Sequence, residues 1–213
     1  MLGCMAVIFL FSAVANGDVT FSNLGPNEEF QDNGWAIGDL NTPEIENRHL
    51  AFQFTAEVTG AIESVEVAVF QTGGQGNNLI TLSIWDDNQG FPGDSLWAGE
   101  TDPAFSNNLL EVFDNTPDSQ QTLVAGESYW LSARSVSSNA SFGWSWNTLG
   151  LFGPATADNN GGTNWEKASE LEQAAFRVNV TVEAIPEPSI LLPLIVLGAF
   201  AMRRSRLNFS CHI

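Results

Sequence analysis

The chain has 213 residues, with 25 acidic against 7 basic residues and a formal net charge of -18. This imbalance excludes ordinary nucleic-acid binding, because a phosphate backbone is held by a basic surface. An apolar fraction of 44%, with 15 Phe and 7 Trp, excludes a disordered acidic chain and is sufficient for a buried core. We therefore expect one compact domain in the middle of the chain.

The first segment, residues 1–17, has the pattern of a secretory signal peptide. An apolar run extends from Met5 to Val14, and at its end the small residues Ala13 and Ala15 have the spacing that a signal peptidase accepts. No Lys or Arg precedes the run, in contrast to the usual signal. We predict cleavage in the region of Ala13 and Ala15, and the alternative is a buried strand or helix of the domain.

Between residues 18 and 183, apolar residues recur mainly with period two. Alternation of this kind places one set of side chains on a core face and the other toward water. The clearest runs cover residues 50–55, 64–70, 79–85, 129–134 and 176–182. Shorter candidate strands cover residues 109–113, 121–124 and 141–146.

Turn-forming residues separate these runs. Gly and Asn accept positive φ and Pro presets its own φ, so residues 73–78, 86–93, 125–127 and 159–162 are expected to turn the chain. Many short strands at this spacing predict an all-β fold, a β-sandwich of jelly-roll type over residues 18–183. One short helix is expected over residues 166–175. The two cysteines, Cys4 and Cys211, fall outside the sandwich, so no disulfide is expected in it.

Catalytic patterns are scarce in this domain. His49 is its one histidine, no Gly-x-Ser-x-Gly motif accompanies it, and its position beside Arg48 indicates a solvated loop residue. Paired carboxylates could serve glycoside hydrolysis, but the abundance of acidic residues singles out no pair. We therefore expect no enzymatic activity and no cofactor.

One acidic turn offers hard oxygen ligands of the kind that Ca²⁺ prefers, from Asp86, Asp87, Asn88 and Asp94. The turn lacks the Asp-x-Asp-x-Asp-Gly spacing of a calcium loop and has no glutamate at the twelfth position. A plain hairpin turn is the alternative interpretation.

The tryptophans raise a second binding hypothesis, because an aromatic face stacks on the apolar C-H face of a pyranose. Trp85, Trp130, Trp144 and Trp146 fall within or at the end of expected strands, where large aromatics usually belong to the core. Trp35, Trp97 and Trp165 lie nearer to loops and are the candidates for a glycan platform.

Two stretches of the domain, residues 79–96 and 123–131, resemble the choice-of-anchor domains of bacterial surface proteins. The shared elements are a strand, an acidic turn with Gly90, Pro92 and Gly93, and a later strand with Gly126, Tyr129 and Trp130. The resemblance implies a surface role without specifying an activity.

The last segment, residues 184–213, combines three features. Pro186, Glu187 and Pro188 precede an uncharged stretch over residues 189–202, and the basic cluster, which we define as Arg203, Arg204 and Arg206, follows it. A helix over residues 189–202 would be about 21 Å long, whereas the hydrocarbon core of a bilayer is about 30 Å thick, so the helix is short for a membrane span. Positive charge after the span is typical of the cytoplasmic side.

These three features, in this order, resemble the PEP-CTERM sorting signal of Gram-negative bacteria. The resemblance implies export by the secretion machinery, transient retention in the inner membrane, processing by an exosortase at the Pro-Glu-Pro region, and delivery to the outer envelope or extracellular matrix. The alternative is a C-terminal membrane anchor that is never processed.

We expect a non-catalytic surface or matrix protein, with extracellular polysaccharide as a partner. The second hypothesis is a carbohydrate-binding module or a jelly-roll glycosidase that carries the same tail.

Overall fold

The computed structural model describes residues 17–38, 49–74, 79–101, 109–114, 121–135, 140–158 and 164–182. All of them belong to one compact unit, Val14–Val182. The signal-cleavage region, the Pro-Glu-Pro motif, the apolar tail and the basic cluster lie outside the described residues. Within the described ranges, no helix has the length and apolar character needed to cross a bilayer.

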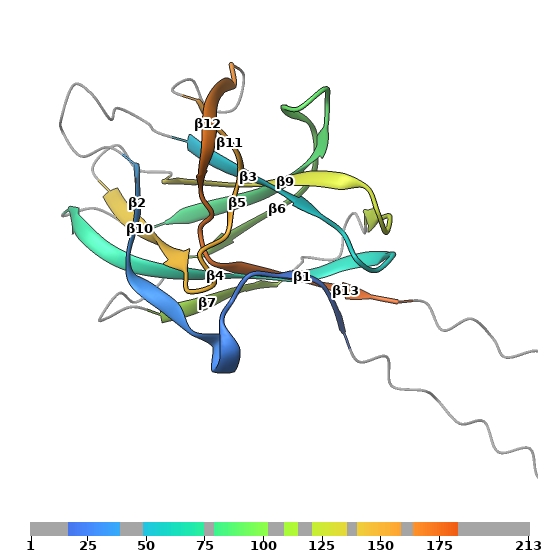
Figure 1. Cartoon of the computed structure of the whole chain (residues 1–213), viewed down its shortest axis with the longest axis horizontal. Coiled ribbons are helices and arrows are strands. Elements are labelled where there is room, and N and C mark those ends of the chain that lie inside the picture. Colours follow the sequence, from blue (N-terminus) through green and yellow to red (C-terminus); the bar gives the residue numbers. More distant parts are fainter. Residues whose placement is uncertain are drawn as a thin grey trace, which may run out of the picture. The chain divides into compact units, whose positions relative to one another are not determined.

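The described strands form two antiparallel sheets (Figure 1). The first sheet has the order β1 (Asp18–Ser22), β13 (Phe176–Thr181), β4 (Gly60–Gly74), β10 (Ala140–Asn147) and β2 (Phe30–Gly38). Two further strands, β7 (Leu109–Asp114) and β8 (Thr122–Leu123), also pair with β4. The second sheet has the order β12 (Glu166–Glu172), β11 (Phe152–Asp158), β3 (His49–Thr55), β9 (Ser128–Ser135), β5 (Ile80–Asp87) and β6 (Pro92–Thr101). A single 3-10 turn, η1 (Pro26–Glu28), follows β1 in the described part of the chain.

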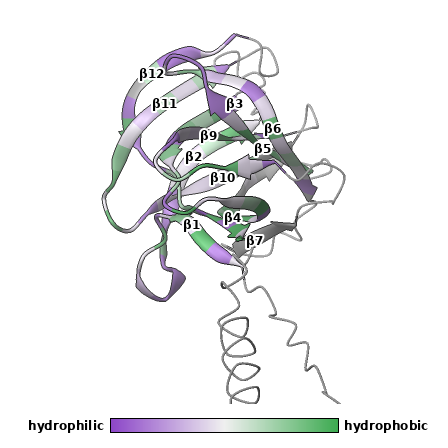
Figure 2. Ribbon diagram, turned by 90° about the vertical axis from the view of Figure 1, so that its right-hand side faces the viewer, coloured by the Kyte–Doolittle hydropathy of each residue, from purple (hydrophilic) through white to green (hydrophobic). Residues whose placement is uncertain are grey.

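The core lies between the two sheets, and the alternation of the sequence explains how it forms. One large cluster of buried residues takes Val65, Val67 and Val69 from β4 of the first sheet and Phe52 and Leu131 from the second. In Figure 2, green apolar and purple polar segments succeed one another along the strands. Because each fully buried side chain of this size contributes about 1.5–3 kcal/mol, the shared core holds the two sheets together. The protein is thus an all-β sandwich of two antiparallel sheets.

All the strand segments predicted from alternation are present among the described residues, and the predicted helix over residues 166–175 is wrong. Its first seven residues form β12, which pairs with β11 from Phe152↔Glu172 to Ala157↔Glu166. An isolated helix of this length is marginal in water, whereas the edge of β11 offers partners for the backbone N-H and C=O groups. Strands β1, β2, β6 and β11 were not among the predicted segments.

The expected turn over residues 86–93 is a tight hairpin between β5 and β6. Asn88 and Phe91 exchange backbone hydrogen bonds of 2.8 and 3.2 Å around Gln89 and Gly90. Both central residues have positive φ, 56° and 86°, which is the geometry of a two-residue turn that matches the twist of the flanking strands. This hairpin fixes the position of Asp86 and Asp87 at the end of β5.

Candidate functional site

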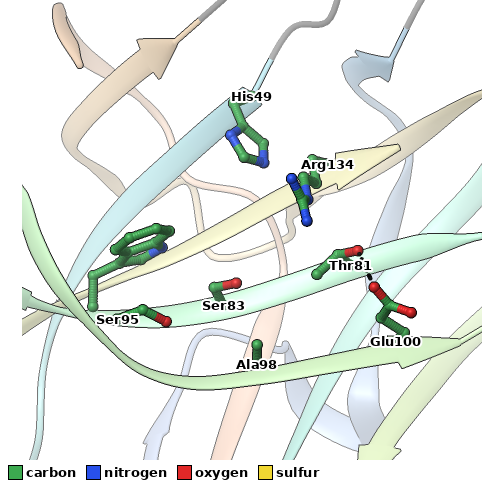
Figure 3. A pocket seen from close by; sticks show the side chains of 8 residues that line it. His49, Thr81, Ser83, Ser95, Ala98, Glu100 and Arg134 are labelled. Carbon is green, nitrogen blue, oxygen red and sulfur yellow. Dashed lines mark hydrogen bonds between the residues drawn. The ribbon is translucent and has the colours of Figure 1, made fainter. Parts of the chain in front are cut away.

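The outer face of the second sheet, which points away from the core, contains the candidate site. Strands β3, β9, β5 and β6 lie side by side there, and their outward side chains surround a pocket of about 460 Å³ (Figure 3). We call it the His49 pocket. Its described lining residues are His49, Thr81, Ser83, Trp85, Ser95, Ala98, Glu100 and Arg134.

Two residues that line this pocket, His49 and Trp85, both contact the ring of Trp165. The His49 ring is stacked on Trp165, with centroids 5.6 Å apart and planes inclined by 12°. Trp165 in turn meets Trp85 edge to face at 5.9 Å. The Trp85 indole is held in place because its Nε1-H donates a 2.8 Å hydrogen bond to Ser132 Oγ. The aromatic side chains that line the pocket, His49 of β3 and Trp85 of β5, are therefore both packed against Trp165, the residue before β12.

His49 is buried, so its assignment to a solvated loop is wrong. It begins β3, where pairing with Asp158 of β11 draws it into the sheet, and it is only 4% exposed. Figure 3 shows its ring pointing from the strand into the pocket, toward the side of Ser83 and Arg134. Burial, with the Arg134 charge second, lowers the pKa of His49 to about 4 despite the opposing charge of Asp158. The imidazole is consequently neutral at pH 7.

The His49 ring also leaves a polar atom unused. Within the described part of the chain, its buried Nδ1 has no hydrogen-bond partner, and the same is true of the buried Nε1 of Trp165. A buried polar group without a partner costs about 1–3 kcal/mol, so native proteins rarely keep one unless something else binds there. Of these two atoms, His49 Nδ1 belongs to a lining residue of the pocket, so it is the candidate partner for a hydrogen-bonding group of a ligand.

Arg134 and Glu100 place opposite charges at separate positions in the pocket. Arg134 is on β9, next to the strand of His49, and is half-buried. Glu100 is on β6, where its Oε1 accepts a 3.2 Å hydrogen bond from the Thr81 hydroxyl. Among the described residues, no carboxylate lies within ion-pair distance of Arg134. Within the described part of the chain, the charge of Arg134 is therefore not neutralised by an ion pair.

The acidic turn borders a second pocket, of about 360 Å³, and Trp165 is one of the residues that line it. The structure brings together the four residues considered for Ca²⁺, namely Asp86, Asp87, Asn88 and Asp94.

Protein donors already use much of the carboxylate capacity of this turn. Asp87 Oδ1 accepts hydrogen bonds from Gln53 Nε2 at 2.8 Å and Trp130 Nε1 at 2.7 Å, and Asp87 Oδ2 accepts one from Gly90 N at 3.2 Å. Asp86 Oδ1 accepts one from Asp94 N at 2.6 Å. No group of three or more metal-ligating side chains is found in the described ranges. These bonds show a role of the carboxylates in shaping the hairpin, and Ca²⁺ binding stays a prediction.

The three tryptophans proposed as a glycan platform have different surroundings. Trp97 is not on the surface: it is 4% exposed and belongs to the core cluster, because β6 pairs it with Ile84 and turns it inward. Trp35 is half-buried on β2, and its Nε1 donates to the Glu172 carbonyl at 2.8 Å. Trp165 lines the pocket beside the acidic turn, which is a position that a platform residue could have.

Trp85 was expected in the core, and that expectation is wrong. It lines the His49 pocket on the face opposite to Ile84. The alternation of β5 contained the necessary signal, because Trp85 has the parity of the polar residues Thr81 and Ser83, whereas the core residues Ile80, Leu82 and Ile84 have the opposite parity. Arg134 has the same outward parity on β9.

No protein-family model matches this chain, and no curated protein sequence matches it either. The geometry of the His49 pocket and the two end segments are therefore the basis for assigning a function.

Proposed function

We propose that this chain is an exported, non-catalytic surface or matrix protein of a Gram-negative bacterium, and that its sandwich binds a saccharide in the His49 pocket. The pocket supplies the binding activity in this proposal, and the end segments supply the destination. The sandwich is taken to be of jelly-roll type, since the chain passes repeatedly from one sheet to the other.

One observation carries the binding proposal: aromatic rings and unused polar groups share one pocket. A saccharide has apolar C-H faces that pack on aromatic rings and hydroxyls that both donate and accept hydrogen bonds. Trp85 offers the aromatic surface and meets Trp165 edge to face. Within the described residues, His49 Nδ1 has no hydrogen-bond partner and Arg134 has no ion pair, so both can offer polar atoms to a ligand. The volume of about 460 Å³ lies within the range of small-molecule sites.

Binding without hydrolysis is favoured by the composition of the pocket. Glycosidases generally place two carboxyl groups on either side of the scissile bond, about 5–9 Å apart. Among the described lining residues of the His49 pocket, Glu100 is the one carboxylic acid. The glycosidase hypothesis would need a second carboxyl group brought to this pocket, so we prefer a binding module.

The destination rests on the sequence of the two ends. A signal peptide over residues 1–17 would direct export, and the tail over residues 184–213, with its resemblance to PEP-CTERM signals, would retain the protein in the inner membrane until an exosortase acts. The intact mass of the protein recovered from the producing cells tests this route. Loss of both end segments is expected, and a retained tail would instead indicate permanent anchoring.

Saccharide binding is tested with a glycan panel and two matched variants. The full chain, purified in mild detergent, is expected to bind members of the panel, and Trp85→Ala should weaken binding about tenfold or more through lost stacking. Phe152→Ala is the control, because Phe152 is a 64% exposed aromatic of β11 outside this pocket. Absence of binding by the unaltered protein, or equal losses in both variants, would contradict the proposed site.

A further inference from the structure

Arg134 is an unusual charge for this protein. The chain carries 7 basic against 25 acidic residues, so most basic groups should find a carboxylate. Arg177 does so, with Glu28 at 3.0 Å and Glu66 at 3.1 Å. Arg134 does not, because no carboxylate among the described residues lies within ion-pair distance of it. A half-buried guanidinium thus lines the His49 pocket, and no carboxylate of the described ranges lies within ion-pair distance of it.

His49 adds a second polar group to the same end of the pocket. It lies on β3 beside the β9 strand of Arg134, it is more than nine-tenths buried, and its Nδ1 has no partner in the described part of the chain. A neutral imidazole has one donor and one acceptor nitrogen. Arg134 offers five N-H donors in a planar fork that matches a carboxylate.

We infer that the saccharide bound in the His49 pocket is acidic and carries a carboxylate, as a uronic acid does, with Arg134 as the partner of that carboxylate. This inference rests on the proposed function and deepens it by naming the ligand class. The Arg134 fork would take the two carboxylate oxygens, the His49 ring would supply a neighbouring hydrogen bond, and Trp85 would cover a face of the sugar ring.

Glu100 orients such a ligand. Figure 3 shows His49, Arg134, Thr81 and Glu100 in the order of their strands β3, β9, β5 and β6. An anionic group is repelled at the Glu100 end and attracted at the Arg134 end, whereas sugar hydroxyls can donate to the Glu100 carboxylate. The carboxylate of the ligand is therefore expected over β9 and the hydroxyls over β6.

The test compares sugars that differ only in charge. Oligosaccharides of galacturonic acid and of glucuronic acid are each paired with their carboxyl-reduced counterparts, in which the carboxylate has become a hydroxymethyl group. Calorimetric titration of the full chain in mild detergent gives the dissociation constant for each member of a pair. At low ionic strength we expect the acidic member of at least one pair to bind ten times more tightly, and the preference to shrink as salt is added.

Two variants assign the preference to Arg134. Arg134→Gln should abolish the tenfold preference, measured as the ratio of the two dissociation constants within each pair, whatever its effect on the binding of the reduced sugar. Arg134→Lys should keep only part of it, because an ammonium lacks the planar fork. Lys167→Gln is the control: it removes the same charge from an exposed position on β12 that does not line the pocket, and it should leave the preference intact. Near-ultraviolet circular dichroism checks that each variant is folded.

The outcomes separate the inference from the proposed function. Equal binding of acidic and reduced sugars overturns the inference and leaves the saccharide site standing. A preference that survives in Arg134→Gln, or that Lys167→Gln also removes, overturns the role of Arg134. Failure of the full chain to bind any acidic or reduced sugar, together with failure on the neutral glycan panel, overturns the proposed function and the inference with it.

Discussion

The buried His49 gives the protein a specific dependence of stability on pH. The pKa of its imidazole is about 4 in the folded protein and 6.5 without the fold. When the pH falls from 7.5 to 5.0, the unfolded chain binds a proton at this position and the folded protein does not. The free energy of unfolding should therefore fall, by about 2 kcal/mol, through this one residue. The loss begins near pH 6.5 and ends near pH 4, below which both states are protonated.

The measurement is urea unfolding at pH 7.5 and pH 5.0, followed by tryptophan fluorescence, in the unaltered protein and in His49→Gln. Carboxylates and His212 also titrate in this pH range, but both proteins contain them, so their contribution to the pH dependence is the same in both. The difference between the two pH-dependent changes therefore isolates His49, even if the substitution alters stability by a constant amount. The unaltered protein should lose about 2 kcal/mol more than the variant.

Equal changes in the free energy of unfolding of the two proteins would refute the reasoning. They would mean that the pKa of His49 is the same in the folded and unfolded states, which is not expected for a buried imidazole. A smaller loss in the unaltered protein than in the variant would indicate that His49 is stabilised as the cation. That result would require the Asp158 charge, which raises the pKa of His49, to outweigh burial and the Arg134 charge, which lower it.

Three further predictions concern the core, a buried polar contact and the tail. Trp97→Ala should lower the free energy of unfolding by about 3–5 kcal/mol in urea titrations, since it empties a buried site, whereas the exposed Phe152→Ala should change it by less than about 0.5 kcal/mol. Asn23→Ala removes two short buried hydrogen bonds, from Asn23 Nδ2 to the Ala174 carbonyl at 2.7 Å and from Phe176 N to Asn23 Oδ1 at 2.7 Å, together with a longer one to Gln173 Oε1 at 3.5 Å. This substitution should lower the free energy of unfolding by about 2–4 kcal/mol in the same assay. Replacing the three arginines of the basic cluster by Glu should weaken membrane retention, measured by cell fractionation, because orientation depends on positive charge at the cytoplasmic side; unchanged retention would contradict that account of the tail.

The fold class was accessible from the pattern of side chains alone. Alternation in β3, β5 and β9 separates buried residues such as Phe52 from outward ones such as Arg134, and the Gly-rich acidic turn predicts the β5–β6 hairpin. These features are local, because period two and positive φ depend on neighbouring residues only. The same parity predicts the outer face for Trp85, against the general tendency of tryptophan to be buried.

Edge strands were harder to predict. Residues 166–172 form β12 only because β11 presents an open edge to them, and β11 itself has mixed composition with a proline, Pro154, in its middle. The pattern of these segments is weak, and pairing with a partner far along the chain decides their conformation. Trp97 is a similar case, since its position in the core follows from its register opposite Ile84 in β5.

By itself, the sequence determined that the middle of this chain is a sheet protein with an acidic surface, and it pointed to export through its two end segments. Only the tertiary structure decided that His49, Trp85 and Arg134 line one pocket and that Trp165 packs against the first two. They come from three strands and from the residue preceding a fourth, and their proximity depends on strand order and register. Pairing over such distances along the chain is a property of the whole fold, and no local pattern of residues encodes it.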